Sequence, residues 1–300
     1  MRIAPDWKQY KVIATGDGEK LEKWGDITLL RPDPQVIWHA KTPLASFKGV
    51  DAVYERSRTG GGMWKYNRNV PSEFTISGRD LTFSLKLMGF KTFQVKPMNF
   101  KHTGLFPEQA VNWDRMMKLI SGAGREISVL NLFGYTGAAS VACLKAGAKV
   151  CHVDSAKAMV ERAGENVRLS GLDNSGMRYI IDDCFKFCQR EIRRGKKYDA
   201  IILDPPSFGR GPNGEKWKIE EGISELCELV AKLLSDNPLF VCLNSYTTGL
   251  QPTVMANILK LTLPQNAIID ADEIGLATEE GLVLPQGCTA FATFANRCTD

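Results

Sequence analysis

The stretch Asn131-Leu132-Phe133-Gly134-Tyr135-Thr136-Gly137 decides the fold, because it ends an apolar, β-rich run and leads directly into a helical pattern. Glycines at such a junction let the backbone approach a bound nucleotide closely and let the helix pack tightly on the strand. The loop lacks the full GxGxxG pattern, which speaks against a nicotinamide or flavin dehydrogenase. The stretch predicts a nucleotide-type ligand site at the start of an α/β fold.

Outward from this loop, short apolar runs alternate with helical patterns. The predicted strands are Ile127–Phe133, Lys149–Val153, Arg178–Ile181, Ala200–Leu203 and Leu239–Leu243. The helical segments between and after them are Gly137–Ala146, Ala156–Ser170, Cys184–Arg194 and Ile219–Ser235. This order predicts a parallel sheet with helices on both faces. Two more strands, one from Ala267 and one over Thr289–Phe294, predict an antiparallel strand at the end of the chain.

Acidic residues follow three of the predicted strands where each strand ends. Asp154 ends the second strand, twenty residues after Gly134, where a carboxylate can accept hydrogen bonds from ribose hydroxyls. Asp182-Asp183 ends the third strand, in position to meet an adenine amine, and Asp204-Pro205-Pro206-Ser207-Phe208 follows the fourth. Each acid alone could be a helix N-cap, but together they predict one ligand site at the carboxyl edge of the sheet.

Residues 1–105 have a different pattern of apolar and polar residues. Short alternating segments are separated by Gly, Pro, Asp and Asn, and no amphipathic helix is evident before Gln109. The segments are Asp26–Leu30, Ala52–Arg56, Glu73–Ile76 and Leu81–Leu87. We therefore expect a small β-rich domain at 1–105, a candidate for substrate or RNA binding, and a second domain at 106–300.

The composition is that of an ordinary globular protein, with 44% hydrophobic and 24% charged residues. No apolar run reaches the roughly 18 residues that span a bilayer, and the N-terminus has no signal-peptide core. We expect a cytoplasmic protein without a membrane partner. None of the eight cysteines forms a CxxC pair, and the three histidines are scattered, so we expect neither a disulfide framework nor a metal site.

The net charge of +4 decides little, but its distribution suggests two basic patches. Residues 81–107 carry no acid and contain Lys86, Lys91, Lys96, Lys101 and His102. A second cluster, interrupted only by Glu191, contains Arg190, Arg193, Arg194, Lys196 and Lys197. Such patches can bind nucleic acid phosphates or can simply be solvated surface.

Residues 103–300 resemble class I methyltransferases, and specifically the branch that methylates bases of large-subunit ribosomal RNA. The resemblance rests on Thr103-Gly104-Leu105-Phe106, the stretch 131–137, Asp154-Ser155, Asp182-Asp183 and Leu203-Asp204-Pro205-Pro206-Ser207-Phe208. It implies a Rossmann-like sheet with helices on both faces, S-adenosyl-L-methionine as cofactor and ribosomal RNA as partner. The oligomeric state stays open.

The resemblance also implies roles for individual residues. The glycine loop would hold the methionine end of the cofactor, Asp154 the ribose, and the acid after the third strand the adenine. The candidate cofactor-binding residues are Asn131, Phe133, Gly134, Tyr135, Thr136, Gly137, Asp154, Ser155, Asp182 and Asp183. The candidate catalytic residues are Asp204, Pro205, Pro206 and Phe208.

The chain departs from relatives that methylate carbon 5 of cytosine, which activate the ring with a cysteine after strand four or five. Here Ser207 follows Asp204-Pro205-Pro206, and Asn244-Ser245-Tyr246 follows strand five. Cys242 lies inside the predicted fifth strand, where a core position is favoured. The sequence thus predicts transfer to a ring or exocyclic nitrogen without a cysteine nucleophile.

Methyl transfer is an in-line displacement that depends mainly on positioning. The rigid prolines after Asp204 could direct backbone carbonyls toward the target nitrogen, while Asp204 accepts a hydrogen bond. Phe208 could stack on a planar base, whereas Trp217 is better explained as a packing residue at a helix start. Two alternatives remain open: a protein or small-molecule methyltransferase, and a non-catalytic RNA- or nucleotide-binding module.

Overall fold

The computed structural model describes residues 1–4, 7–56, 62–71, 73–86, 103–210 and 216–294. The chain divides into two compact units. The first contains Met1–Arg2, Val111–Ile274 and Gly287–Asp300, and the second contains Ile3–Ala110 and Gly275–Gln286. A domain boundary between residues 105 and 106 stays a prediction, and the segment Gly275–Gln286, which belongs to the second unit, was not foreseen.

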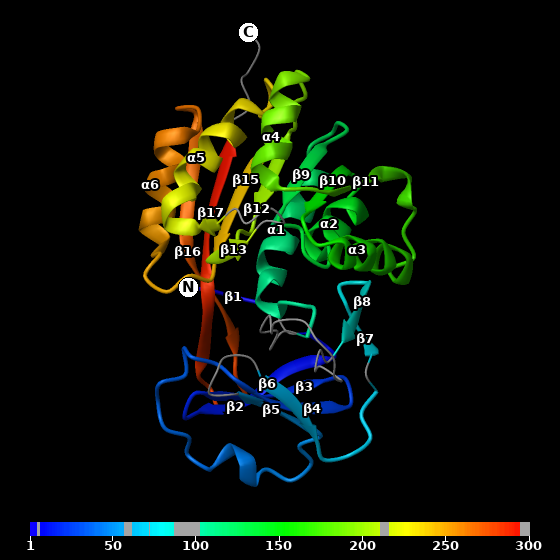
Figure 1. Ribbon diagram of the computed structural model, residues 1–300, viewed down its shortest axis with the longest axis vertical. Helices are drawn as coiled ribbons and strands as arrows, with labels where there is room; N and C mark the ends of the chain where they lie inside the picture. Colours follow the sequence, from blue (N-terminus) through cyan, green and yellow to red (C-terminus); the bar gives the residue numbers. More distant parts are fainter. Residues whose placement is uncertain (5–6, 57–61, 72, 87–102, 211–215, 295–300) are drawn as a thin grey trace. The chain divides into compact units, whose positions relative to one another are not determined.

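Among the described residues, an eight-stranded sheet organises the first unit, in the order β1-β16-β17-β15-β12-β9-β10-β11 (Figure 1). The strands are β1 (Arg2–Ile3), β9 (Ser128–Leu132), β10 (Lys149–Asp154), β11 (Met177–Ile181), β12 (Ala200–Leu203), β15 (Phe240–Ser245), β16 (Ala267–Ala277) and β17 (Val283–Phe294). Strands β9 to β12 and β15 run parallel, and β17 pairs antiparallel with β15. The predicted fold class is confirmed.

The chain reverses its direction of travel across the sheet between β9 and β12. It moves from β9 outward to β10 and β11, and then returns to β12 and β15 on the other side of β9. Open α/β sheets bind their ligands at such a switch point, outside the carboxyl ends of the strands. The loops that follow β9 and β12 are the stretch 133–137 and the stretch 204–208, so the two predicted motifs flank this point.

Alternating side chains of the central strands enter two separate hydrophobic cores. In β12, Ile201 and Leu203 belong to one core, and Ala200 and Ile202 belong to the other. This period of two follows from strand geometry, and it explains why the strands read as continuous apolar runs. The first core is completed by α4, α5 and α6, and the second by α1 and α2, so helices cover both faces as predicted.

Helices α2 to α5 end close to the predicted bounds, whereas no bounds were predicted for α1 and α6. They are α1 (Ala110–Ser121), α2 (Ala138–Lys145), α3 (Lys157–Leu169), α4 (Cys184–Arg193), α5 (Ile219–Lys232) and α6 (Pro252–Thr262), with 3-10 turns at Leu44–Ser46, Pro107–Gln109 and Asn174–Gly176. A short antiparallel pair, β13 (Phe208–Arg210) and β14 (Lys216–Lys218), lies between β12 and α5. Of the described helices, none is long and apolar enough to cross a bilayer.

The second unit is β-rich, as predicted. Its described strands form a five-stranded sheet in the order β2-β3-β4-β5-β6 and a separate hairpin, β7–β8. The bounds are β2 (Tyr10–Gly16), β3 (Glu19–Trp24), β4 (Ile27–Pro32), β5 (Ala52–Arg56), β6 (Gly62–Tyr66), β7 (Glu73–Gly78) and β8 (Leu81–Lys86). Ala14, Leu21, Leu30 and Leu44 form one of its buried apolar clusters. Strands β2, β3 and β6 of this unit were not predicted from the sequence.

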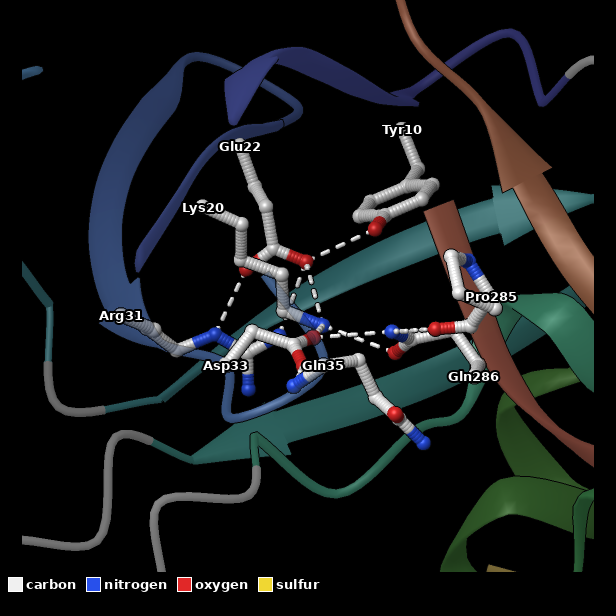
Figure 2. Close-up of polar contacts among 8 residues, drawn as sticks. All are labelled: Tyr10, Lys20, Glu22, Arg31, Asp33, Gln35, Pro285 and Gln286. Carbon is white, nitrogen blue, oxygen red and sulfur yellow. Dashed lines mark hydrogen bonds and ion pairs between the residues drawn. The ribbon is translucent and has the colours of Figure 1, made fainter. Parts of the chain in front are cut away.

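Buried charges hold part of this unit together (Figure 2). Glu22 is fully buried and receives two hydrogen bonds from Arg31, with Nε–Oε2 at 2.6 Å and Nη2–Oε1 at 2.9 Å. The hydroxyl of Tyr10 donates to Glu22 Oε1 at 2.7 Å. Burial alone raises the pKa of Glu22, but Arg31, Lys20 and the hydrogen bonds outweigh it and lower that pKa. Glu22 is therefore a paired carboxylate at neutral pH.

The same cluster includes the C-terminal segment. Lys20 Nζ lies 3.1 Å from Asp33 Oδ2 and donates to Gln286 Oε1 at 2.9 Å, and Gln286 Nε2 donates to Asp33 Oδ2 at 2.8 Å. Two cations and two carboxylates thus compensate one another while nearly excluded from solvent. Gln286, at the end of Gly275–Gln286, is bonded in this way to residues near the N-terminus (Figure 2).

Candidate functional site

The loop between β9 and α2 bends through left-handed backbone at Phe133, Tyr135 and Gly137, with φ of 55°, 50° and 84°. Such φ values cost a non-glycine residue about 1–2 kcal/mol, so neighbouring contacts must hold Phe133 and Tyr135 in place. One such contact is the Gly134 N–H, which donates to the Val153 carbonyl at 2.9 Å. The loop is therefore a fixed turn anchored on β10.

Two glycines allow this close approach. A Cβ on Gly134 would lie 2.3 Å from Cε1 of His152, and a Cβ on Gly137 would lie 2.6 Å from Cβ of Ala163. Both distances are shorter than van der Waals contact, and Gly137 also needs its positive φ. The predicted glycines are thus required by packing against β10 and α3.

A buried polar network supports the loop from below. Asn131 Nδ2 donates to Ser140 Oγ at 2.8 Å, and Ser140 Oγ lies 3.0 Å from His152 Nδ1. Burial lowers the pKa of His152 to about 4, so its imidazole is neutral at pH 7. Asn131 and Thr136 are 2% and 1% exposed, which places their side chains within the fold rather than at the surface of the loop. Ser140 and His152 were missed, since nothing in the local sequence brings them together.

Asp154 joins the end of β10 to the glycine loop. Its Oδ2 accepts the Tyr135 N–H at 2.9 Å, and its Oδ1 accepts the Ala156 N–H at 2.8 Å. Burial raises the pKa of Asp154, and the two backbone N–H bonds partly oppose that shift. The neighbouring Ser155 is exposed. The carboxylate is therefore oriented by backbone N–H groups of the loops that follow β9 and β10.

The two acids after β11 have different partners. Asp183 caps α4, since its Oδ1 accepts the Lys186 N–H at 2.9 Å. Asp182 accepts the Asp183 N–H at 2.9 Å and forms an ion pair with Arg190. The Asp182 N–H donates to the Asp154 carbonyl at 3.1 Å, which brings the ends of β10 and β11 together. A contact with adenine stays a prediction for both acids.

The stretch 204–208 begins at the end of β12. Pro205 is buried, Asp204 is half-buried, and Phe208 is 50% exposed at the start of β13. The Pro206 carbonyl accepts a hydrogen bond from Trp217 Nε1 at 2.6 Å. Of the carbonyls expected to face a target nitrogen, that of Pro206 therefore already has a donor.

The loops after β12 and β15 are joined by hydroxyl groups. Ser207 Oγ and Thr247 Oγ1 are 2.7 Å apart, and the Thr247 N–H donates to Ser245 Oγ at 3.1 Å. These serines occupy the two places where a carbon-5 methyltransferase would need a cysteine. Both places carry hydroxyls that bind one another through Thr247.

The described cysteines are thiols packed in the protein rather than poised nucleophiles. Cys242 and Cys184 are buried, and burial raises the pKa of each thiol far above its ordinary value. A thiol with so high a pKa supplies almost no thiolate at pH 7.

A second polar network lies at the end of β15. Asn112 Nδ2 donates to Asn244 Oδ1 at 3.2 Å and to Thr289 Oγ1 at 2.9 Å, and the Thr289 hydroxyl donates to Asn244 Oδ1 at 2.7 Å. All three side chains are buried. They join α1, β15 and β17, and their separation in sequence explains why the network was not predicted.

The second basic cluster is largely paired. Arg190 binds Asp182, Arg194 Nη1 lies 3.1 Å from Glu191 Oε1, and Lys197 Nζ donates to the Lys232 carbonyl at 2.8 Å. These contacts favour a solvated protein surface over a phosphate site. In the first cluster, Lys91, Lys96, Lys101 and His102 lie outside the described residues, as does the side chain of Lys86. Within the described part of the chain, no group of three His, Cys, Asp or Glu side chains could hold a metal ion.

Known proteins match the part of the chain that carries these motifs. A family model of S-adenosylmethionine-dependent methyltransferases matches residues 65–257. Ribosomal RNA large subunit methyltransferase I of Aeromonas salmonicida is 38% identical over 111 residues, which cover 37% of this chain and 27% of that protein. The chain spans 48%, 27% and 20% of the length of three curated relatives named as ribosomal RNA large subunit methyltransferases.

Solved structures match over nearly the whole chain. The SAM-dependent methyltransferase from Agrobacterium tumefaciens superposes with a TM-score of 0.89 at 31% identity, over 97% of this chain and 92% of that one. The protein SMU.776, solved in complex with SAH, gives a TM-score of 0.74 at 20% identity over 97% of this chain and 76% of that one, which supports the fold alone.

Proposed function

Since the chain belongs to the family of S-adenosylmethionine-dependent methyltransferases, we propose that it transfers a methyl group to a nitrogen of a ribosomal RNA base, without a cysteine nucleophile. The observation that carries the proposal is the arrangement at the switch point. The loop 133–137, the carboxylate of Asp154 and the stretch 204–208 lie at the carboxyl ends of β9, β10 and β12. β9 pairs directly with both β10 and β12.

The residues at this edge fit the cofactor of the family. Each Asp154 oxygen accepts one backbone N–H, so each keeps a second lone pair for a ribose hydroxyl. The left-handed turn at Phe133, Tyr135 and Gly137 fixes the course of the backbone that we expect to face the ligand. When bound, S-adenosylmethionine would supply an electrophilic methyl carbon, which would bond to the acceptor lone pair while the C–S electron pair leaves with sulfur as a neutral thioether. We assign Phe133–Gly137, Asp154 and Ser155 to holding the cofactor.

The acceptor side fits a planar, N–H-bearing base. Phe208, four residues after Asp204, is half exposed, and unstacked RNA bases stack on aromatic side chains. As the acceptor nitrogen forms its bond to carbon it must lose a proton, and we assign Asp204 to accept the hydrogen bond from that N–H. Relatives named as ribosomal RNA methyltransferases support RNA over other acceptors. A cytoplasmic location and RNA binding by residues 1–105 belong to the same proposal.

Nitrogen is favoured over carbon 5 of cytosine by the side chains at the two nucleophile positions. Ser207 and Ser245 stand there. Cys242, three residues before Ser245, is fully buried in the core on the opposite face of β15 from Leu243. A serine hydroxyl without an adjacent base is a poor nucleophile toward a pyrimidine ring. Direct attack by a nitrogen lone pair needs no such group.

The test is incubation of the purified protein with methyl-labelled S-adenosylmethionine and separated pools of RNA, protein and metabolites from cells lacking its gene. We expect label in the RNA pool and loss of that label in Asp204→Ala. Label in protein or metabolites would establish the alternative acceptors. No transfer to any pool, together with unimpaired RNA binding, would favour the non-catalytic module.

A further inference from the structure

Trp217 contacts two loops of the candidate site and the first turn of α4. Its Nε1–H donates to the carbonyl of Pro206 at 2.6 Å. Its ring centroid lies 5.8 Å from that of Phe133, in the glycine loop, and 5.6 Å from that of Phe185, in the first turn of α4. Pro206, Phe133 and Phe185 follow β12, β9 and β11, respectively. The Trp217 side chain therefore contacts the segments that follow three different strands.

The indole has a fitted place in the fold. A Cβ on Gly222, in the first turns of α5, would lie 2.5 Å from Cζ3 of Trp217, so the glycine leaves room for the ring. Gly209 is the cross-strand partner of Trp217, and a Cβ on Gly209 would lie 3.6 Å from Cβ of Trp217, which is ordinary contact. The indole ring therefore packs closely on α5, while the backbone of Trp217 pairs with β13.

We propose that Trp217 is a positioning residue for methyl transfer, which sets the position of the acceptor motif Asp204-Pro205-Pro206 relative to the cofactor loop. Its ring packs on Phe133, and its Nε1–H fixes the Pro206 carbonyl. Methyl transfer needs donor and acceptor held in line, and small misplacements lower the rate steeply. The proposal rests on the proposed function, because it assigns the stretch 204–208 to the acceptor.

The hydrogen bond and the packing can be separated by substitution. Trp217→Phe keeps an aromatic ring against Phe133 and Phe185 but removes the donor to Pro206. We expect S-adenosylhomocysteine to bind within threefold of wild type by calorimetry. We expect kcat at saturating cofactor to fall about three- to tenfold, the range that corresponds to one lost hydrogen bond. An unchanged kcat, or a loss seen only in cofactor affinity, would overturn the proposal.

A pair of glycine variants provides the matched comparison. Gly222→Ala moves a methyl group into the indole, so we expect it to lower kcat at least as much as Trp217→Phe. Gly209→Ala faces the same side chain at ordinary contact distance, and we expect kcat within twofold of wild type. Equal losses in both variants would show that crowding the indole has no special effect on kcat, and would overturn the proposal. Should Trp217→Phe fail to fold by circular dichroism, the glycine pair decides.

A spectroscopic measurement tests the link without any RNA. In protein labelled with 5-fluorotryptophan, the ¹⁹F resonance missing from Trp217→Phe identifies Trp217. We expect S-adenosylhomocysteine to shift that resonance in wild type, and Gly222→Ala to displace it before any ligand is added. If the chemical shift of Trp217 does not change when S-adenosylhomocysteine is added, the proposed link to the cofactor loop is wrong. Absence of methyl transfer to RNA by wild type would instead refute the acceptor assigned under the proposed function.

Discussion

The backbone N–H of Tyr135 donates a hydrogen bond to Oδ2 of Asp154 over 2.9 Å, which ties the glycine loop after β9 to the carboxylate at the end of β10. Tyr135 holds a φ of 50°, so the carboxylate helps to stabilise a backbone conformation that the residue alone would avoid. The acid that we assign to the ribose thus also shapes the loop that we assign to the rest of the cofactor.

Replacement of Asp154 should therefore affect ligand binding more than folding. Asp154→Ala removes two charge-assisted ribose hydrogen bonds, each worth roughly 1.5–3 kcal/mol. We expect S-adenosylhomocysteine to bind at least tenfold more weakly by calorimetric titration, with native circular dichroism. Asp173→Ala is the control, because Asp173 is also a capping carboxylate but caps the 3-10 turn Asn174–Gly176. Unchanged affinity in Asp154→Ala would remove this residue from the site.

Gly134 should tolerate no side chain. Gly134→Ala places a methyl group 2.3 Å from the buried His152 ring, and overpacking of this kind typically costs about 1–3 kcal/mol. We expect lower stability in thermal unfolding and weaker S-adenosylhomocysteine binding. Gly164→Ala is the matched control within α3, where the new Cβ meets Tyr179 at 3.6 Å and helix propensity improves. Equal stability of the two variants would contradict the tight packing under the loop.

The buried cluster of the second unit gives a stability prediction with a defined pH dependence. Glu22→Gln leaves Arg31 without its carboxylate, and breaking a buried pair typically costs about 3–5 kcal/mol. We expect faster amide hydrogen exchange in β3 and β4, whereas Lys65→Gln, in the exposed Lys65–Glu55 pair, should change little. The pKa of Glu22 is lowered, so its contribution is complete above the unfolded-state pKa and is lost as pH falls through the folded-state value. Exchange rates that do not differ at pH 7 would show that the cluster contributes nothing.

Cysteine replacement should spare catalysis. Cys242→Ala and Cys184→Ala remove buried thiols, so we expect most of the methyl-transfer activity to remain, with a core-packing loss of roughly 1 kcal/mol. RNA containing 5-fluorocytidine should form no stable adduct with the protein in denaturing electrophoresis. An adduct that disappears in one cysteine variant would establish the covalent route that we exclude.

The apolar strands were predictable, and the polar ones were not. Ala200–Leu203 matches β12 because a strand buried on both faces reads as a continuous apolar run. Glu19–Trp24 reads as exposed and charged, yet Lys20 and Glu22 are buried, since partners distant in sequence neutralise them. Strand β17 begins at Val283, whereas the predicted strand began at Thr289. The prediction was too short because Pro285 and Gly287 are residues typical of turns.

For the site, too, only part could be predicted from the sequence. The order of loop, acid and Asp204-Pro205-Pro206 along the chain located the carboxyl edge of the sheet, because parallel strands align such features. Which side chains support the edge depends on long-range contacts. His152 under Gly134, and Trp217 against Pro206, could be found only once the strands were placed side by side. Local sequence favoured a packing role for Trp217 and gave no sign of its hydrogen bond.

The most direct test of the central claim is the chemical identity of the transferred mark. Large-subunit ribosomal RNA from cells lacking the gene is treated with the purified protein and S-adenosylmethionine, digested to nucleosides and analysed by mass spectrometry against synthetic standards. We predict one nucleoside methylated on a ring or exocyclic nitrogen, present with wild type and absent with Asp154→Ala and Asp204→Ala. A methyl group on carbon 5 of cytidine, or RNA that stays unmodified while a protein or metabolite gains the methyl group, would contradict the account.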